Sequence, residues 1–161
     1  DLSDERLHIV LQSPGGPFGT KDFRIAFEAV PFEAGRTLLH IGYGYGFGAA
    51  ARFAMSAYLS TLGRGKVGFS VVGRDAEGKP QFVDGMRGLI ERNTLRYHLA
   101  IEAYLDAPGP TDDQALRSRV QAWFDATERH PQQLHELERG EYIAAKLAQV
   151  QRARTQPPPD R

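Results

Sequence analysis

The sequence predicts an α+β fold, in which a curved antiparallel sheet grips a long helix and two further helices follow. In the first half of the 161 residues, apolar residues alternate with polar ones, which is typical of strands. Short stretches rich in Gly, Pro and Asp separate these segments, as in hairpins. The second half has helical periodicity instead. Strands followed by helices, rather than strands alternating with them, indicate the α+β class.

The alternation of apolar residues places the strands. Pro and Gly after Gln12 end the first one, and Gly35 marks a hairpin loop between the second and third. Asp75 to Gly78 predicts another hairpin later in the chain. We expect five strands in a single sheet, at residues 6–12, 22–30, 37–47, 66–73 and 80–84.

The third strand contains the most unusual stretch of the chain. On one face it carries Ile41, Tyr43, Tyr45 and Phe47, and on the other it carries mainly glycine. Several glycines in one strand indicate either a bend or the close approach of a backbone or ligand. The neighbouring hairpins favour a bent sheet with its aromatic face turned inward.

Four helices are predicted, at residues 49–62, 86–105, about 112–127 and 132–153. The helix at 86–105 has one apolar stripe and one charged arc. Leu95 and Leu99 interrupt that arc, so we expect the following helix to cover part of it. Arg92 and Arg96 lie one turn apart in the arc and could together hold an anion, but with Glu91 and other acids nearby we expect ordinary pairing at the surface.

Composition limits the classes of protein that fit. Lys plus Arg equals Asp plus Glu at 20 each, which argues against a general nucleic-acid binder. Cysteine is absent, and no apolar window is long enough to span a membrane. We expect one domain over residues 1–153 and a disordered tail at 154–161. The chain begins at Asp1, which is consistent with a missing N-terminal part, and the compartment, cytoplasmic or periplasmic, stays open.

Candidate catalytic and metal-binding residues are few. His135 and Glu138 have the spacing of two metal ligands but lack a third, so a solvated surface explains them better. His40 is a general-base candidate, with Glu28 as its expected neighbour across the hairpin. Neither arrangement amounts to a catalytic signature. We therefore predict no catalytic residue, no metal and no cofactor.

A glycine-rich turn provides an alternative. Gly46 to Ala51 matches G-x-G-x-x-A between a strand and a helix, as in dinucleotide-binding enzymes. In that hypothesis Gly46 and Gly48 hold the cofactor, and Asp75 binds a ribose hydroxyl. Bulky tyrosines in the strand and the antiparallel hairpins around it argue against this alternative.

Several segments resemble a family of uncharacterised proteobacterial proteins. They are residues 13–20, 66–69, 87–94 and 126–131, and the resemblance covers about residues 8–150. Those proteins are similar, distantly, to the START-like (SRPBCC) superfamily, whose curved sheet grips a long C-terminal helix around an apolar cavity. The resemblance implies binding or transport of a lipid or another apolar small molecule. The chain departs from the superfamily pattern in its inserted helix at 49–62 and in the two helices that follow the long one.

The leading hypothesis is therefore a helix-grip domain that binds an apolar small molecule or lipid. A further alternative is a protein-interaction module or homodimer formed through the C-terminal helices. Its contact residues would be Trp123, Phe124, Leu134 and Leu137, unless these pack inside the chain on Leu95 and Leu99. The predicted cavity wall consists of Phe27, Tyr43, Tyr45, Asn93 and Tyr97.

Overall fold

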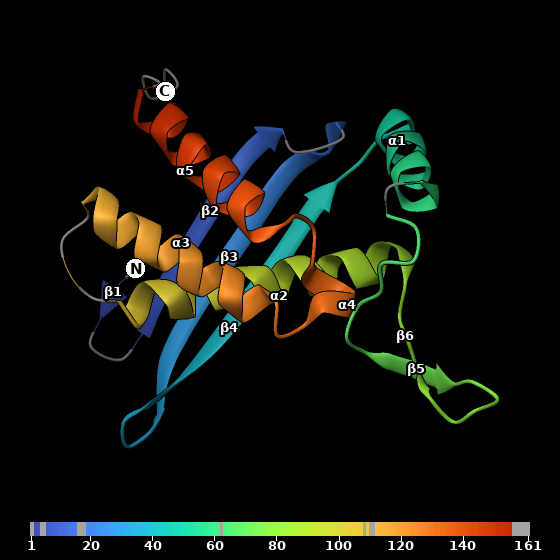
Figure 1. The fold of residues 1–161 in the computed structure, drawn as a ribbon, viewed down its shortest axis with the longest axis horizontal. Coiled ribbons are helices and arrows are strands. Elements are labelled where there is room, and N and C mark those ends of the chain that lie inside the picture. The colour runs from blue at the N-terminus through green and yellow to red at the C-terminus, as the bar shows by residue number, and fades with distance from the viewer. Residues whose placement is uncertain are drawn as a thin grey trace.

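A computed structural model describes residues 2–3, 6–15, 19–61, 63–107, 109 and 112–155. Strands precede most of the helices along the chain, as the sequence predicts (Figure 1). The elements are β1 (Leu2–Ser3), β2 (Arg6–Gly15), β3 (Lys21–Glu33), β4 (Arg36–Gly46), α1 (Ala49–Ser60), β5 (Val71–Arg74), β6 (Pro80–Phe82), α2 (Gly85–Leu105), α3 (Asp113–Thr127), α4 (Pro131–Leu134) and α5 (Arg139–Thr155).

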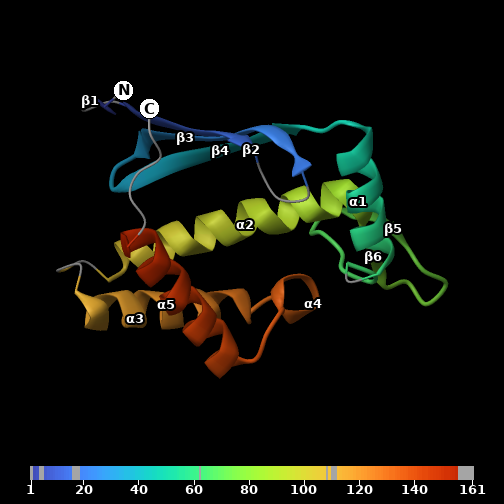
Figure 2. The same ribbon diagram turned by 90° about the horizontal axis from the view of Figure 1, so that it is seen from above.

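The main sheet is antiparallel throughout, in the order β1-β2-β3-β4. It lies along one side of α2, and α3, α4 and α5 lie on the other side, so α2 is the middle layer of three (Figure 2). No described helix covers the opposite face of the sheet. The predicted α+β class, with a curved antiparallel sheet against a long helix and further helices after it, is confirmed.

The face of the sheet turned toward α2 carries the odd-numbered residues of all three long strands. Ile25 on β3 is buried, and the rings of Tyr43 on β4 and Tyr97 on α2 lie 6.2 Å apart. On β2 the same face is open, since Ile9 and Leu11 are about half exposed although they pair with inward-facing residues of β3. The apolar contact with α2 is therefore concentrated under β4 and the adjoining part of β3.

A bulge bends β3 opposite the glycines of β4. The register shifts between Lys21 and Arg24, where the pairing is Lys21 with Gly46 and Arg24 with Gly44. Within the bulge Asp22 has a φ of 50°, which is unusual for a residue other than glycine. The bulge gives the local bend that the sequence predicts. Close packing is not the reason for Gly44, because a side chain there would meet open space.

The prediction of five strands in one sheet is wrong. β5 and β6 form a separate hairpin, and residues 66–70 are not a strand. The backbone N–H groups of Phe69 and Ser70 donate to the Glu91 carboxylate on α2, at 2.8 and 2.9 Å, so they cannot join a ladder. The predicted turn at Asp75 to Gly78 is present, with the Gly78 N–H donating to the Asp75 carbonyl.

The predicted helix at 132–153 is interrupted between α4 and α5. Leu134 packs with Leu99 of α2, whereas Tyr142 and Ile143 pack with Phe124 of α3. Contact with two different helices requires a change of direction, which residues 135–138 supply. Of the predicted tail, residues 154–155 end α5 and the remainder lies outside the described residues.

The C-terminal helices pack on α2 as the sequence predicts. Leu99 is buried and Leu95 lies against the same cluster, together with Trp123. Asp112 caps α3, since its side chain accepts a hydrogen bond from the Ala115 N–H at 2.7 Å. The C-terminal helices therefore pack on the side of α2 that faces away from the sheet and fix the position of α2 against the sheet (Figure 2).

Candidate functional site

A pocket of about 190 Å³ lies where the sheet, α1 and α2 meet. Its walls are mainly aromatic and aliphatic, with a few polar groups supplied by α2 and by the segment between α4 and α5. The lining residues are Thr20, Phe23, Tyr43, Tyr45, Met55, Tyr58, Leu89, Arg92, Asn93, Arg96 and Glu136. We call this the aromatic pocket.

The sheet wall of the aromatic pocket is a cluster of three rings. Phe23 lies within the bulge of β3, two residues before the buried Ile25, so its side chain is on the same face of the sheet as Tyr43 and Tyr45 of β4. Its ring meets that of Tyr43 edge-on at 5.2 Å and stacks near that of Tyr45 at 6.3 Å. Such ring contacts hold aromatic side chains in defined orientations and give a firm, apolar wall.

The tyrosine hydroxyls of this wall are neutral hydrogen-bond donors. Burial, with Tyr97 nearby, raises the pKa of Tyr43 to about 12. Burial also raises the pKa of Tyr45, whose hydroxyl donates to the Met86 sulfur at 2.7 Å. Neither phenol ionises near neutral pH, so neither serves as a base there.

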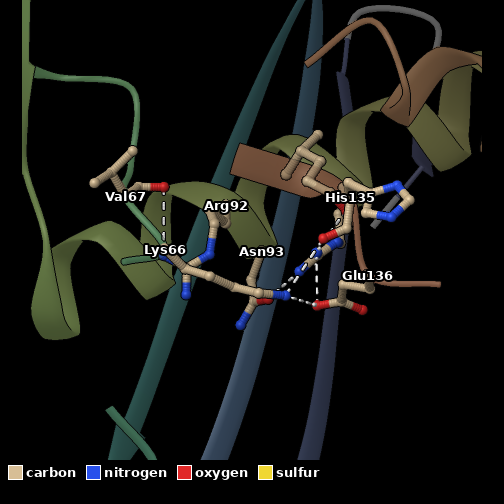
Figure 3. Close-up of polar contacts among 8 residues, drawn as sticks. Lys66, Val67, Arg92, Asn93, His135 and Glu136 are labelled. Atoms are coloured by element: carbon tan, nitrogen blue, oxygen red, sulfur yellow. Dashed lines mark hydrogen bonds and ion pairs between the residues drawn. The ribbon is translucent and has the colours of Figure 1, made fainter. Parts of the chain in front are cut away.

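Arg92 forms the most unusual part of the α2 wall. The residue is 1% exposed, and its guanidinium donates one hydrogen bond, at 3.3 Å to the Val67 carbonyl (Figure 3). Within the described residues no carboxylate lies within ion-pair distance of it. Burial lowers the pKa of Arg92, although a guanidinium remains charged at neutral pH. A buried charge without a counter-ion is costly.

Arg96, one turn further along α2, is well satisfied. It forms an ion pair with Glu136 at 2.7 Å and donates to the Leu134 carbonyl at 3.1 Å. Lys66 also lies 3.8 Å from the Glu136 carboxylate, from outside the pocket (Figure 3). The single carboxylate of the pocket is therefore shared by two cations, neither of which is Arg92.

A second, more open groove of about 690 Å³ runs along the other flank of α2. Glu91 forms its polar part and is itself bonded to the 69–70 backbone and to the Ser70 hydroxyl. Its lining residues are Leu39, Ile41, Phe69, Ser70, Ile90, Glu91, Thr94, Leu95 and His98.

Three of the five residues predicted for the cavity wall, Tyr43, Tyr45 and Asn93, line the aromatic pocket. Tyr97 lies behind the wall against Tyr43, and Phe27 lies further along β3, opposite Ile41. Arg92 and Arg96, named above as a pair that could hold an anion, line the aromatic pocket too. The other lining residues were not predicted: Thr20, Phe23, Met55, Tyr58, Leu89 and Glu136.

The expectation that Arg92 pairs at the surface is wrong, and the sequence held a signal against it. Arg92 shares a helix face with Leu95 and Leu99, which were recognised as covered. Residues 66–70 and the α4–α5 connection complete that cover, and both are distant from Arg92 in sequence.

The dinucleotide alternative required a parallel β–α–β unit, which the described residues do not form. β4 pairs antiparallel with β3, and β5 pairs only with β6. Gly48 is the N-cap residue of α1, whereas Gly46 ends β4. The Asp75 carboxylate accepts from the N–H groups of Glu77 and Lys79, so it holds the β5–β6 turn.

The histidine candidates occupy exposed positions. His40 faces Glu28 across β3 and β4 as predicted, with 3.9 Å between Nδ1 and the carboxylate, on the sheet face turned away from α2. His135 pairs with Glu128 and not with Glu138. The part of the chain that the structure describes contains no group of three or more metal-ligating side chains.

The residues predicted to contact a partner lie mostly inside the chain. Phe124 and Leu134 are buried, Trp123 packs against the cluster around Leu99, and Leu137 is partly exposed at 42%. Their packing within one chain is the alternative that the sequence analysis named.

Comparison with protein-family models, curated proteins and solved structures gave no match to this chain. Among the described residues, no helix combines the length and the apolar character needed to cross a membrane.

Proposed function

We propose that this protein binds a compact, largely apolar small molecule in the aromatic pocket and does not act on it chemically. The observation that carries the proposal is a pocket with four aromatic rings, from Phe23, Tyr43, Tyr45 and Tyr58, and only a few polar groups. Small-molecule sites commonly combine an apolar lining with a few polar groups that orient the ligand. The rings supply contact area, and Asn93 supplies an amide for orientation.

The size of the pocket favours a compact ligand over a lipid with long acyl chains. A volume of about 190 Å³ holds roughly ten non-hydrogen atoms at the packing density of protein interiors, taking about 20 Å³ for each. That is below the range of most drug-sized sites. The START-like resemblance implies a cavity in the same place, between a curved sheet and a long helix.

The proposal is tested by an NMR titration of the full chain with phenylacetamide, a neutral aromatic probe of this size. We expect saturable shifts confined to resonances of pocket residues. Phe23→Leu removes a ring from the pocket and should weaken binding about tenfold. Phe27→Leu is the matched control, on the same strand and the same face but outside the lining, and should leave binding unchanged.

Native mass spectrometry of the purified chain gives an independent readout. A molecule with a mass near that of phenylacetamide that stays bound to the protein, and that is lost in the Phe23→Leu variant, would support the proposal. If neither this neutral probe nor a charged analogue of the same size causes saturable shifts, or if both variants lose affinity equally, the aromatic pocket is not the binding site.

A further inference from the structure

Arg92 gives the aromatic pocket a charge that the protein does not balance. The guanidinium has five N–H donors, yet within the described part of the chain it donates a single long hydrogen bond, to the Val67 carbonyl at 3.3 Å. The residue is 1% exposed and lines the pocket, so bulk water cannot solvate it as it would an arginine at the surface. Among the described residues its other N–H groups have no hydrogen-bond partner, and the residue borders the pocket.

The neighbouring groups compensate this charge only in part, through Glu136. The described residues of the lining include two guanidinium groups and one carboxylate, and that carboxylate, Glu136, lies 2.7 Å from Arg96 and also 3.8 Å from Lys66. Glu91, which precedes Arg92 in the sequence, faces the other flank of α2, where its carboxylate accepts hydrogen bonds from the Ser70 hydroxyl and from Arg87. The lining therefore carries one excess positive charge, which a bound monoanion would balance.

From this geometry we infer that the ligand of the aromatic pocket is a small acid, with a carboxylate that binds Arg92 and an apolar body that contacts the rings. This inference rests on the proposed function, since it concerns the same pocket. A planar guanidinium can donate two parallel hydrogen bonds to a carboxylate. Both groups are then shielded from water, which strengthens the interaction. The pocket leaves little room for a larger anionic group beside an apolar ring.

The inference is tested with two probes of nearly the same size and shape, the anion phenylacetate and the neutral phenylacetamide, titrated into the full chain at neutral pH and constant ionic strength. We expect phenylacetate to bind about tenfold more tightly, which is the usual effect of a hydrogen-bonded charge pair. Arg92→Met should remove this preference by weakening phenylacetate about tenfold, with phenylacetamide changed by less than about twofold.

Arg87→Met is the matched control. Arg87 lies on the same helix, and its exposed side chain pairs with Glu91 outside the aromatic pocket, so the preference for the acid should persist in this variant. Arg92→Lys keeps a positive charge and should retain part of the preference. Circular dichroism verifies that each variant is folded, and the comparison of the two probes in the unmodified protein requires no variant.

Two outcomes separate this inference from the proposed function. If the acid and the amide bind equally to the unmodified protein, or if the preference survives Arg92→Met, the inference is overturned while binding in the pocket stands. If neither probe binds, the proposed function fails as well.

Discussion

Replacing Glu91 with Gln should destabilise the protein strongly, and the effect should depend on pH. The carboxylate accepts hydrogen bonds from the backbone N–H groups of Phe69 and Ser70 and from the Ser70 hydroxyl, and it pairs with Arg87. It thereby fastens the segment before β5 to α2. Burial alone would raise the pKa of Glu91, but these hydrogen bonds hold it at about 2, against an ordinary 4.5.

The magnitude follows from that difference in pKa. Linkage converts it to about 3 kcal/mol of folding free energy at neutral pH. The side chain is 21% exposed, so solvent screens part of this, and we expect Glu91→Gln to lower the free energy of unfolding by about 2 kcal/mol. The folded-state pKa is depressed, so the stabilisation is complete above the unfolded pKa and is lost as the pH falls toward 2.

Urea denaturation, followed by the fluorescence of Trp123, the only tryptophan, measures this effect. The difference in the free energy of unfolding between the unmodified protein and Glu91→Gln should have its full value at pH 7 and less than about half of that value at pH 3. Glu102→Gln is the control. Among the described residues the Glu102 side chain pairs only with His98, on the exposed side of the same helix, so this substitution should change stability by less than about 0.5 kcal/mol. An equal loss at both pH values would refute the linkage argument.

Three further predictions concern packing, ionisation and capping. Gly88→Ala should lower the free energy of unfolding, measured by urea denaturation, by about 1 kcal/mol or more, because a Cβ at this position would lie 2.9 Å from the Val83 carbonyl oxygen. The control is Gly140→Ala in α5, where a Cβ meets open space, and it should be neutral or stabilising by about 0.5 kcal/mol in the same assay. Burial raises the pKa of Tyr43 and of Tyr142 to about 12, so ultraviolet titration should show tyrosines that ionise well above pH 10. Because the folded-state pKa is raised, the free energy of unfolding should fall as the pH rises from about 10 to about 12. Complete ionisation of the tyrosines by pH 11 without unfolding would contradict this. Asp112→Ala removes the N-cap of α3 and should cost about 1 kcal/mol by thermal or urea denaturation, and a cost below about 0.3 kcal/mol would mean that the cap contributes little.

The sequence sufficed for the parts of the fold that depend on local pattern. The first three long strands, α2 and α3 follow from periodicity of two or 3.6 residues, and the turn at Gly78 follows from its composition. Residues 66–70 look like a strand by composition. They are not one because Glu91, 22 and 21 residues further along the chain, accepts the N–H groups of Phe69 and Ser70. Local propensity cannot report a hydrogen-bond partner of that kind.

The same limit applies to the aromatic pocket. Tyr43, Tyr45 and Asn93 were predicted because alternation in a strand and the stripe of a helix fix the direction of a side chain. Alternation with Ile25 also places Phe23 on this face, whereas Glu136 reaches the pocket only because of the break between α4 and α5. The sequence predicted Arg92 to be solvent-exposed because a charged residue is usually found at the surface. Its spacing from Leu95 and Leu99 nevertheless indicated that it shares their buried face.

The open edge of β4 has a consequence for the behaviour of the protein in concentrated solution. Within the described residues this strand pairs only with β3, so its other edge presents unpaired backbone groups along eleven residues. Proteins usually protect such edges with charge or proline, but β4 contains no proline, and Arg36 and His40 are its only basic residues. A zero formal net charge adds little repulsion between molecules. The preparation should therefore self-associate through strand pairing as its concentration rises, and a lysine introduced at Gly44, where a side chain meets open space, should suppress this.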